Sequence, residues 1–351
     1  MSRRARRLAV FFKPTKYAFA ILIAAFLLGG GGLGGWLKPD LPIAGSIVRM
    51  LFGGSGPDST SPRAASASAG GAAGETLRIA SFNIQVLGTS KMGKPEVVAT
   101  LSEIIRQFDV VAIQEIRSKD PEIIPRLVKQ VNAEGGNYKF VIGPRLGRTV
   151  SKEQYAYVFD ANRVLYNPDS VGTVLDPSDV LHREPFFVQF LARTDQPEKA
   201  FSFWLVNIHT DPDEVPQELA ALAQVYSIMK NTRFAEDDVI LLGDFNAAAS
   251  EMLPLGQVPG LQTVIANQPT NTRLTKSYDN LLFDQATVNE FTGSSGVYSI
   301  QDRHGMKLEQ ALEVSDHLPV WAEFSVWESG LGGGASGGRV ATLPASSDAS
   351  R

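Results

Sequence analysis

Short apolar runs that end in polar side chains recur along this chain. Runs at residues 77–82, 108–113, 201–208 and 239–242 have the length and composition of buried strands. They lead into Asn83, Gln114-Glu115, His209 and, after Gly243, Asp244-Phe245-Asn246. Asp279-Asn280 precedes another run at 281–283, and Asp316-His317 precedes a last strand that includes residues 321–324. Asp and Asn are rare within strands and costly to bury unpaired, so this recurrence indicates a site rather than packing.

Three longer segments repeat their apolar residues near the helical period. They lie at residues 95–107, 122–131 and 215–230, each between two of the strand-like runs. Strands that alternate with helices usually form a parallel sheet, so this pattern alone favours a doubly wound fold. We find no internal repeat in the chain.

The polar strand ends would form a rim if they met at one edge of a sheet. The rim would comprise Asn83, Glu115, His209, Asp244, Asn246, Asp279, Asp316 and His317. Carboxylate and amide oxygens, in a chain without cysteine, suit a hard divalent cation, and two histidines add proton-transfer capacity. Such a set suits phosphate ester hydrolysis. The structural alternatives are an Asx turn at Asp244 and histidines that merely end strands.

One pairing can be limited from sequence alone. Neighbouring residues of an extended segment point to opposite sides, so Asp316 and His317 cannot easily share a hydrogen bond. We therefore expect His317 to take its carboxylate partner from elsewhere in the chain.

The order of these motifs resembles the endonuclease/exonuclease/phosphatase superfamily over residues 77–327. The resemblance rests on Asn83, Gln114-Glu115, His209, Gly243-Asp244-Phe245-Asn246, Tyr278-Asp279 and Ser315-Asp316-His317. Three local segments resemble the deoxyribonuclease I branch more specifically. They are Pro144–Arg148 with Lys152–Tyr155, Arg183-Glu184-Pro185, and Gln114–Arg117.

The resemblance implies an α+β fold, a four-layer α/β sandwich of two packed, mainly antiparallel sheets flanked by helices. It implies that Glu115 is the main ligand of Mg²⁺, with Mn²⁺ or Ca²⁺ as alternatives, and that Asn83 and Asp316 assist it. Asp244 and Asn246 would then orient the attacking water and the scissile phosphate.

The resemblance also pairs each histidine with a carboxylate. His209 with Glu153 would transfer a proton to the leaving oxygen, and His317 with Asp279 would stand near the phosphate. The sequence does not assign the acid and base roles between the two histidines. Arg117, Arg183 and Asn83 would contact the substrate.

Two departures from deoxyribonuclease I, and the overall charge, bear on the substrate. Ser151 stands where an aromatic residue would stack in the DNA minor groove, and Gln85 replaces a basic residue, each weakening duplex binding by about 1–3 kcal/mol. The chain's net charge of −4 becomes −11 for residues 77–330, once the +6 of residues 1–76 and the +1 of residues 331–351 are set aside. Tight association with DNA through a basic surface is therefore not expected. The calcium site of the family is echoed only by Thr270 and Thr272 and is not assigned.

The two ends of the chain differ in composition from residues 77–328, the expected catalytic domain. Residues 1–38 combine a basic flank with an uncharged run of 21 residues, Tyr17 to Leu37, long enough for a transmembrane anchor. A cleaved signal peptide is the alternative, because the strongly apolar part, Ala18 to Leu28, has only 11 residues. Residues 39–76 are expected to be a flexible linker and 329–351 a disordered tail.

These features lead to one hypothesis for function and two alternatives. The hypothesis is a membrane-anchored, metal-dependent phosphodiesterase that acts on DNA outside the cytoplasm. We expect the protein to lie in a bacterial cell envelope, or to be secreted if its N-terminus is cleaved. The first alternative is a phosphatase or phospholipase C-type hydrolase of phosphorylated lipid headgroups, resembling a sphingomyelinase. The second is a tethered binding module without catalysis. No protein partner is indicated.

Overall fold

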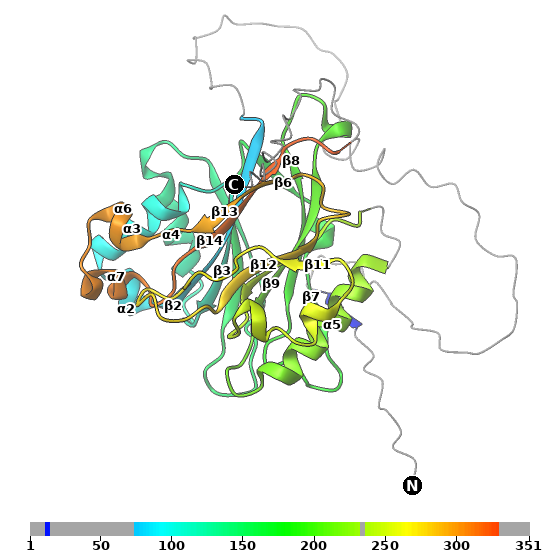
Figure 1. Cartoon of the computed structure of the whole chain (residues 1–351). Helices are drawn as coiled ribbons and strands as arrows, with labels where there is room; N and C mark the ends of the chain where they lie inside the picture. Colours follow the sequence, from blue (N-terminus) through cyan, green and yellow to red (C-terminus); the bar gives the residue numbers. More distant parts are fainter. Residues whose placement is uncertain (1–10, 15–73, 232–235, 330–351) are drawn as a thin grey trace, which may run out of the picture.

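The computed structural model describes residues 11–14, 74–231 and 236–329. Two mixed sheets pack face to face, with helices outside each of them (Figure 1). Within the described residues, no helix has both the length and the apolarity required to cross a bilayer. The expected anchor at Tyr17–Leu37, the linker up to residue 73 and the tail from residue 330 lie outside those residues.

The first sheet has the order β1-β7-β8-β9-β10-β12-β11, with β6 paired to β8. Its strands are β1 (Phe11–Pro14), β6 (Val164–Tyr166), β7 (Gly172–Leu175), β8 (Phe186–Ala192), β9 (Ser202–His209), β10 (Val239–Asp244), β11 (Leu261–Thr263) and β12 (Asp279–Asp284). Only β9 and β10 run parallel among these pairs.

The second sheet has the order β13-β14-β2-β3-β5-β4. Its strands are β2 (Thr76–Leu87), β3 (Val110–Ile116), β4 (Tyr138–Ile142), β5 (Gln154–Asp160), β13 (Phe291–Val297) and β14 (Val320–Ser325). Here only β2 and β3 run parallel.

The helices lie on the outer faces of the two sheets (Figure 1). The α-helices are α2 (Thr89–Met92), α3 (Pro95–Ile105), α4 (Ile123–Val131), α5 (Val215–Asn231), α6 (Ile300–His304) and α7 (Leu308–Val314). Short 3₁₀ turns are η1 (Asn132–Glu134), η2 (Pro168–Ser170), η3 (Pro197–Lys199), η4 (Ala249–Glu251) and η5 (Leu255–Gln257). Three of the α-helices, α3, α4 and α5, confirm the predicted periodic segments to within two residues at each end.

Three apolar clusters fill the spaces between these layers. The cluster between the sheets is rich in aromatic side chains, among them Tyr157, Phe186, Phe190, Phe203 and Phe324. A second cluster packs α3 and α4 against β2 and β3. A third packs α5 against β9 and β10. The layers therefore stack as helix, sheet, sheet and helix, which confirms the four-layer sandwich.

The doubly wound alternative is wrong, and its failure has a simple cause. The pattern correctly places helices between strands, but most neighbouring strands pair antiparallel, and parallel pairing occurs only at β2–β3 and β9–β10 among the described strands. The four strands of these two pairs carry polar motifs at or near their C-terminal ends.

Candidate active site

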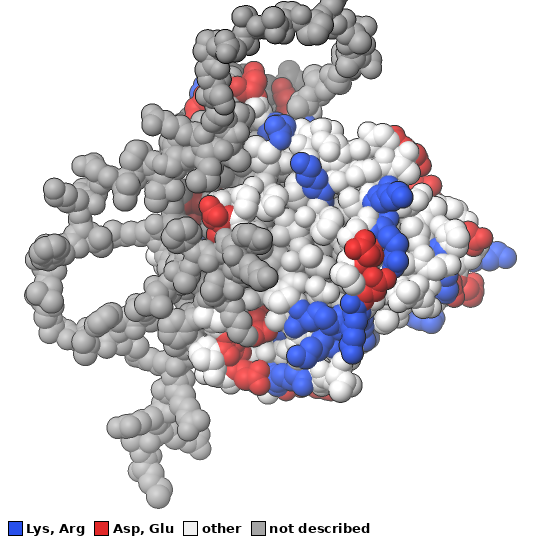
Figure 2. Space-filling model, turned by 180° about the vertical axis from the view of Figure 1, so that it is seen from behind, with Lys and Arg blue, Asp and Glu red and all other residues white. Residues whose placement is uncertain are grey.

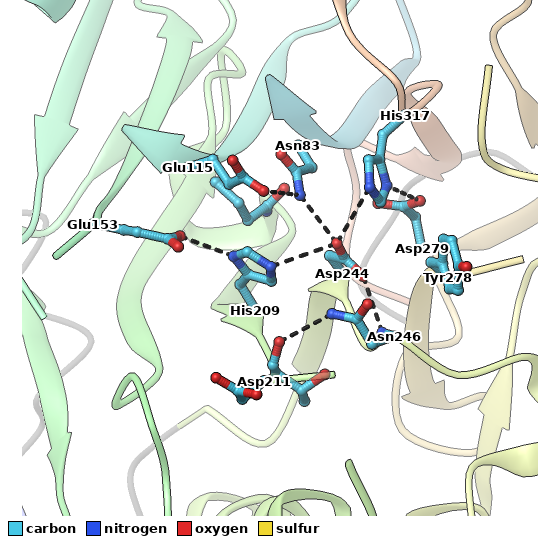
Figure 3. A network of polar contacts seen from close by, with 12 residues as sticks. Asn83, Glu115, Glu153, His209, Asp211, Asp244, Asn246, Tyr278, Asp279 and His317 are labelled. Atoms are coloured by element: carbon cyan, nitrogen blue, oxygen red, sulfur yellow. Dashed lines mark hydrogen bonds and ion pairs between the residues drawn. The ribbon is translucent and has the colours of Figure 1, made fainter. Parts of the chain in front are cut away.

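Strand pairing gathers the polar strand ends at one edge of the sandwich (Figure 3). Asp244 lies opposite His209 in the parallel pair of β10 and β9, and opposite Asp279 in the antiparallel pair of β10 and β12. In the other sheet, Asn83 of β2 lies opposite Gln114 of β3. The predicted rim therefore exists and draws on both sheets.

Unusual backbone conformations accompany this edge. At Gly243 a Cβ would lie 1.9 Å from the carbonyl oxygen of Ile208, so only glycine allows β9 and β10 to approach this closely before Asp244. Glu115 and Asn246 adopt φ angles of 62° and 48°, which non-glycine residues rarely adopt. Such strain commonly occurs where side-chain placement serves a site.

One arm of the site is the pair of His209 and Glu153. The Nδ1 atom of His209 lies 2.9 Å from Oε2 of Glu153, and its Nε2 atom lies 3.6 Å from Oδ2 of Asp244. Burial alone would raise the pKa of Glu153, but His209, Arg183 and Arg117 together lower it to about 2. Glu153 is therefore an ionised carboxylate that fixes the imidazole.

The other arm is the pair of His317 and Asp279. The Nδ1 atom of His317 lies 2.9 Å from Oδ2 of Asp279, and its Nε2 atom lies 3.6 Å from Oδ2 of Asp244. Its sequence neighbour Asp316 is farther, with 3.9 Å between Oδ1 and Nε2. The expectation that His317 pairs with another carboxylate is thus confirmed. Burial lowers the pKa of His317, but the charges of Asp279 and Asp244 outweigh it and raise the pKa to about 11.

Asp244 stands between the two arms and is almost fully buried. It accepts hydrogen bonds from Nδ2 of Asn83 at 3.0 Å and from the backbone N–H of Asn246 at 2.9 Å. Burial raises its pKa, but the charges of His317 and His209 and these hydrogen bonds lower the pKa below its usual range. Asn246 is held in turn by a hydrogen bond from its Nδ2 to the carbonyl of Thr210.

The predicted metal ligands form a group of oxygens beside Asp244. Within the described part of the chain, Oδ1 of Asn83 and Oδ1 of Asp316 are buried and have no hydrogen-bond partner. Glu115 accepts a hydrogen bond from Nδ2 of Asn83 at 3.3 Å. The pKa of Asp316 is raised, first by its burial and in addition by the charge of Glu115. Buried oxygens without donors and two mutually repelling carboxylates fit a hard cation.

A second set of possible ligand atoms lies within the arms. Asp244, Asp279 and His317 each offer an atom within 4.8 Å of the others. His317 and Asp279 already satisfy one another through their hydrogen bond, so the Asn83, Glu115 and Asp316 group is the better match to an oxygen-seeking cation.

The two arginines expected to contact substrate occupy different positions. Arg117 is about one-third exposed and reaches Glu115 and Glu153 at 3.2 and 3.3 Å. Arg183 is buried, and it donates to the carbonyls of His209 and Thr210 and to Oε1 of Glu153. These contacts hold β9 and Glu153 in place, and the prediction that Arg183 contacts the substrate stays a prediction.

Two further residues of the site were missed by sequence reasoning. Thr270 donates its hydroxyl to Asp279 at 2.7 Å and was considered only for a calcium site. Lys91 donates to the carbonyl of Val314, and burial lowers its pKa to about 8 despite the nearby charges of Asp316 and Glu115. No strand end or motif marks either residue. The polar segment of residues 268–277 before Asp279 is a sequence signal that could have drawn attention to Thr270.

The sandwich and this set of groups define a protein suited to hydrolysing phosphate esters. Residues 80–317 match the model of the Endonuclease/Exonuclease/phosphatase family. The chain belongs to this family, in its deoxyribonuclease I-like branch.

Similar proteins support this placement at two levels. Over 270 residues the chain is 32% identical to deoxyribonuclease-1-like 1 of Sus scrofa, covering 73% of this chain and 83% of the relative. Over 265 residues it is 31% identical to deoxyribonuclease-1 of Gallus gallus, covering 70% and 91%. Among solved structures, a humanized D. rerio TDP2 superposes with a TM-score of 0.51 at 15% identity, covering 72% of this chain and 100% of that one. The last comparison bears on the fold alone.

Proposed function

We propose that this protein is a divalent-metal-dependent phosphodiesterase that cuts DNA as an endonuclease. The family assigns it to hydrolases of phosphodiester bonds, and relatives named deoxyribonucleases support DNA as substrate. The observation that carries the proposal is the convergence of two carboxylate-backed histidines on Asp244, next to oxygens that lack donors.

Each residue of the site has a role in this proposal. Asp244 orients the attacking water and takes up its proton, while Asn246 helps to place the phosphate. His317, which is protonated and paired with Asp279, binds a non-bridging phosphate oxygen. His209 donates a proton to the leaving oxygen, and the Glu153 carboxylate orients its imidazole through Nδ1.

A cation is part of this proposal. Glu115, Asp316 and Asn83 would hold Mg²⁺, with Mn²⁺ or Ca²⁺ as substitutes. When bound, the ion supplies neutralisation of phosphate charge. Arg117, partly exposed beside Glu115, would contact a phosphate, whereas Arg183 would act mainly as a positioning residue for Glu153.

Binding to DNA is proposed to be weak and dependent on the metal. On the face seen in Figure 2, basic side chains form a band that acidic side chains interrupt. Ser151, which stands where an aromatic residue would stack, is exposed in the loop before β5. With a net charge of −11 over residues 77–330, these features support low affinity without loss of catalysis.

The test presents several phosphoesters to the full-length protein in parallel. Supercoiled plasmid, single-stranded DNA, RNA, sphingomyelin vesicles and inositol phosphates are each incubated with MgCl₂ or with EDTA. We expect plasmid nicking that requires the metal and falls about 10³-fold or more in Asp244→Asn. Asp169→Asn makes the same change at an exposed residue of η2 and should nick like the parent.

The other outcomes reassign the function. Turnover of sphingomyelin or inositol phosphates without nicking would replace the proposal with a headgroup phosphatase or phospholipase. DNA binding without any turnover would replace it with a binding module. Nicking at the parent rate by purified Asp244→Asn would refute the proposed site.

We also propose that residues 1–38 place the domain outside the cytoplasm as a membrane anchor. The support is the sequence alone, a basic flank followed by the uncharged run Tyr17–Leu37. In cells that express the full chain, the protein should sediment with membranes, resist carbonate extraction and be cut by protease added outside. Release into the medium would indicate a cleaved signal peptide, and a cytoplasmic location would refute export.

A further inference from the structure

A second cluster of carboxylates lies at the opposite end of β10 from the active site. Asp238 directly precedes β10, whereas Asp244 ends it, so about 20 Å of strand separates the two. Glu290 directly precedes β13, and Glu328 follows β14. One side-chain oxygen from each of Asp238, Glu290 and Glu328 lies within 4.8 Å of the others.

Asp238 and Glu290 are buried, Glu328 is partly exposed, and their oxygens are only partly satisfied by hydrogen bonds. Asp238 and Glu290 are 4% and 3% exposed. Oε1 of Glu290 accepts from the N–H of Ser329 at 2.6 Å, and Oε1 of Glu328 accepts from the N–H of Ser202 at 2.8 Å. Among the described residues, however, Oδ1 of Asp238 and Oε2 of Glu290 are buried without any hydrogen-bond partner. Backbone donors thus hold Glu290 and Glu328, while one oxygen of Asp238 and one of Glu290 lack a donor among the described residues.

The described residues also supply no positive charge to the cluster. Across residues 74–231 and 236–329, no lysine, arginine or histidine forms an ion pair with Asp238, Glu290 or Glu328. Burial, and then the charges of Glu290, Glu328 and Asp237, raise the pKa of Asp238 to about 8. Three close carboxylates, two of them buried, are costly when ionised unless a cation neutralises them, and a bound proton is the alternative that the experiment below distinguishes.

The donor set selects the kind of cation. All the available atoms are oxygens, and the described part of the cluster contains no histidine, which disfavours zinc. Oxygens bound to one Ca²⁺ at 2.3–2.6 Å lie at most about 5 Å apart, which agrees with the spacing of this cluster. Calcium also tolerates irregular geometry and additional water ligands better than magnesium does.

We propose that Asp238, Glu290 and Glu328 form a structural Ca²⁺ site that is separate from the active site. The ion would join the start of β10 in the first sheet to the ends of β13 and β14 in the second. The backbone of β9 belongs to the same unit, because Trp204 donates its N–H to the carbonyl of Asp238. The site therefore ties the two sheets together where the described chain ends.

The experiment measures calcium binding and thermal unfolding of the full-length protein in a Glu115→Gln background. That background weakens the proposed catalytic metal site, so the remaining calcium binding reports on the cluster. We expect one equivalent of bound Ca²⁺ by calorimetric titration. At 100-fold excess over Kd, the Tm should rise by roughly 5–10 °C relative to EDTA.

Variants at the cluster separate a calcium site from a group of protonated carboxylates. Asp238→Asn and Glu290→Gln, each added to Glu115→Gln, should abolish the calcium-dependent rise in Tm and the bound equivalent. In EDTA both should unfold at the same temperature as the background or higher, because they remove repulsion. Asp169→Asn, the same change at an exposed residue of η2, should keep the calcium response.

Two results would overturn the site. The first is the absence of any bound equivalent or Tm rise in the Glu115→Gln protein, and the second is a response that survives in Asp238→Asn and Glu290→Gln. Neither readout depends on nuclease activity, so failure of this site is distinguishable from failure of the proposed function.

Discussion

The two histidine arms of the active site have the same distances around the histidine but differ in the groups that contact the carboxylate. Each histidine lies 2.9 Å from its carboxylate and 3.6 Å from Oδ2 of Asp244. Behind His209, Glu153 shares its charge with two arginines, whereas behind His317, Asp279 has only the hydroxyl of Thr270 as a further side-chain partner among the described residues.

This difference shows how one structural unit can be given two functions. A carboxylate whose charge is shared with Arg117 and Arg183 is fixed in its ionised form, as its pKa of about 2 indicates. Asp279 is paired with no arginine among the described residues, and its charge together with that of Asp244 raises the pKa of His317 to about 11. The first arm suits transfer of a proton, and the second suits a permanent positive charge near phosphate.

Removing the histidines should have the largest effect. His209→Gln and His317→Gln should each lower kcat for plasmid nicking by about 10²–10⁴-fold. Because both act around Asp244, the double variant should lose less than the product of the two single losses. Initial nicking rates at saturating Mg²⁺ measure this, with His304→Gln, outside the site, as the matched control. Multiplicative losses would show that the arms act independently.

Removing the carboxylate should lower the free energy of unfolding more in the His209 arm than in the His317 arm. Glu153→Gln leaves the buried Arg183 without its counter-charge and should lower the free energy of unfolding by about 3 kcal/mol. Asp279→Asn leaves no buried arginine behind and should cost less. Urea unfolding at pH 7 followed by tryptophan fluorescence compares the two. Equal losses would contradict the special role of the arginines.

The pKa of Glu153 makes a prediction for acid stability. Its value of about 2 in the folded protein lies below the ordinary value of 4.5, so its stabilising contribution is complete above pH 4.5 and is lost as the pH falls towards 2. Between pH 6 and pH 3, the parent should lose about 2 kcal/mol more than Glu153→Gln does. Urea unfolding at both pH values measures the difference. Parallel losses would mean that the arginines do not hold this carboxylate ionised.

Much of the fold was predictable because burial leaves a periodic trace in the sequence. The helices α3, α4 and α5 and the central strands β2, β3, β9 and β10 follow from apolar spacing. Strand direction has no such trace, because a buried strand reads the same in parallel and antiparallel pairs. The sandwich was therefore predicted from the resemblance alone, while the pattern itself favoured the wrong arrangement.

The site was predictable where a polar residue interrupts an apolar run. Asn83, His209 and Asp244 stand out in this way, and the resemblance added Glu153 from a segment without a strand-end signal. Sequence could not show that Arg183 points inward, since an arginine reads the same whether it faces solvent or a buried carboxylate.

The acidic cluster was also beyond the sequence. Asp238, Glu290 and Glu328 lie far apart along the chain, and only the packing of the sheets brings them together. Acidic residues at such spacing are ordinary on a protein surface, so the burial of Asp238 and Glu290 is the informative observation.

The smallest expected effect tests the hydroxyl behind Asp279. Thr270→Val keeps the shape of the side chain but removes the donor to Asp279 and the acceptor for the backbone N–H groups of Tyr278 and Asp279. We expect a loss of about 1–2 kcal/mol in unfolding free energy. The nicking rate should fall only a few-fold, because the pairing of His317 with Asp279 persists.

Thr270→Ser is the matched control, since serine retains the hydroxyl and should restore both stability and rate. If Thr270→Val instead lost as much activity as His317→Gln, the hydroxyl would be as necessary to the His317 arm as the histidine itself. The proposed contrast between the arms would then be wrong. Asp279 would depend on its single neutral donor as strongly as Glu153 depends on its two arginines.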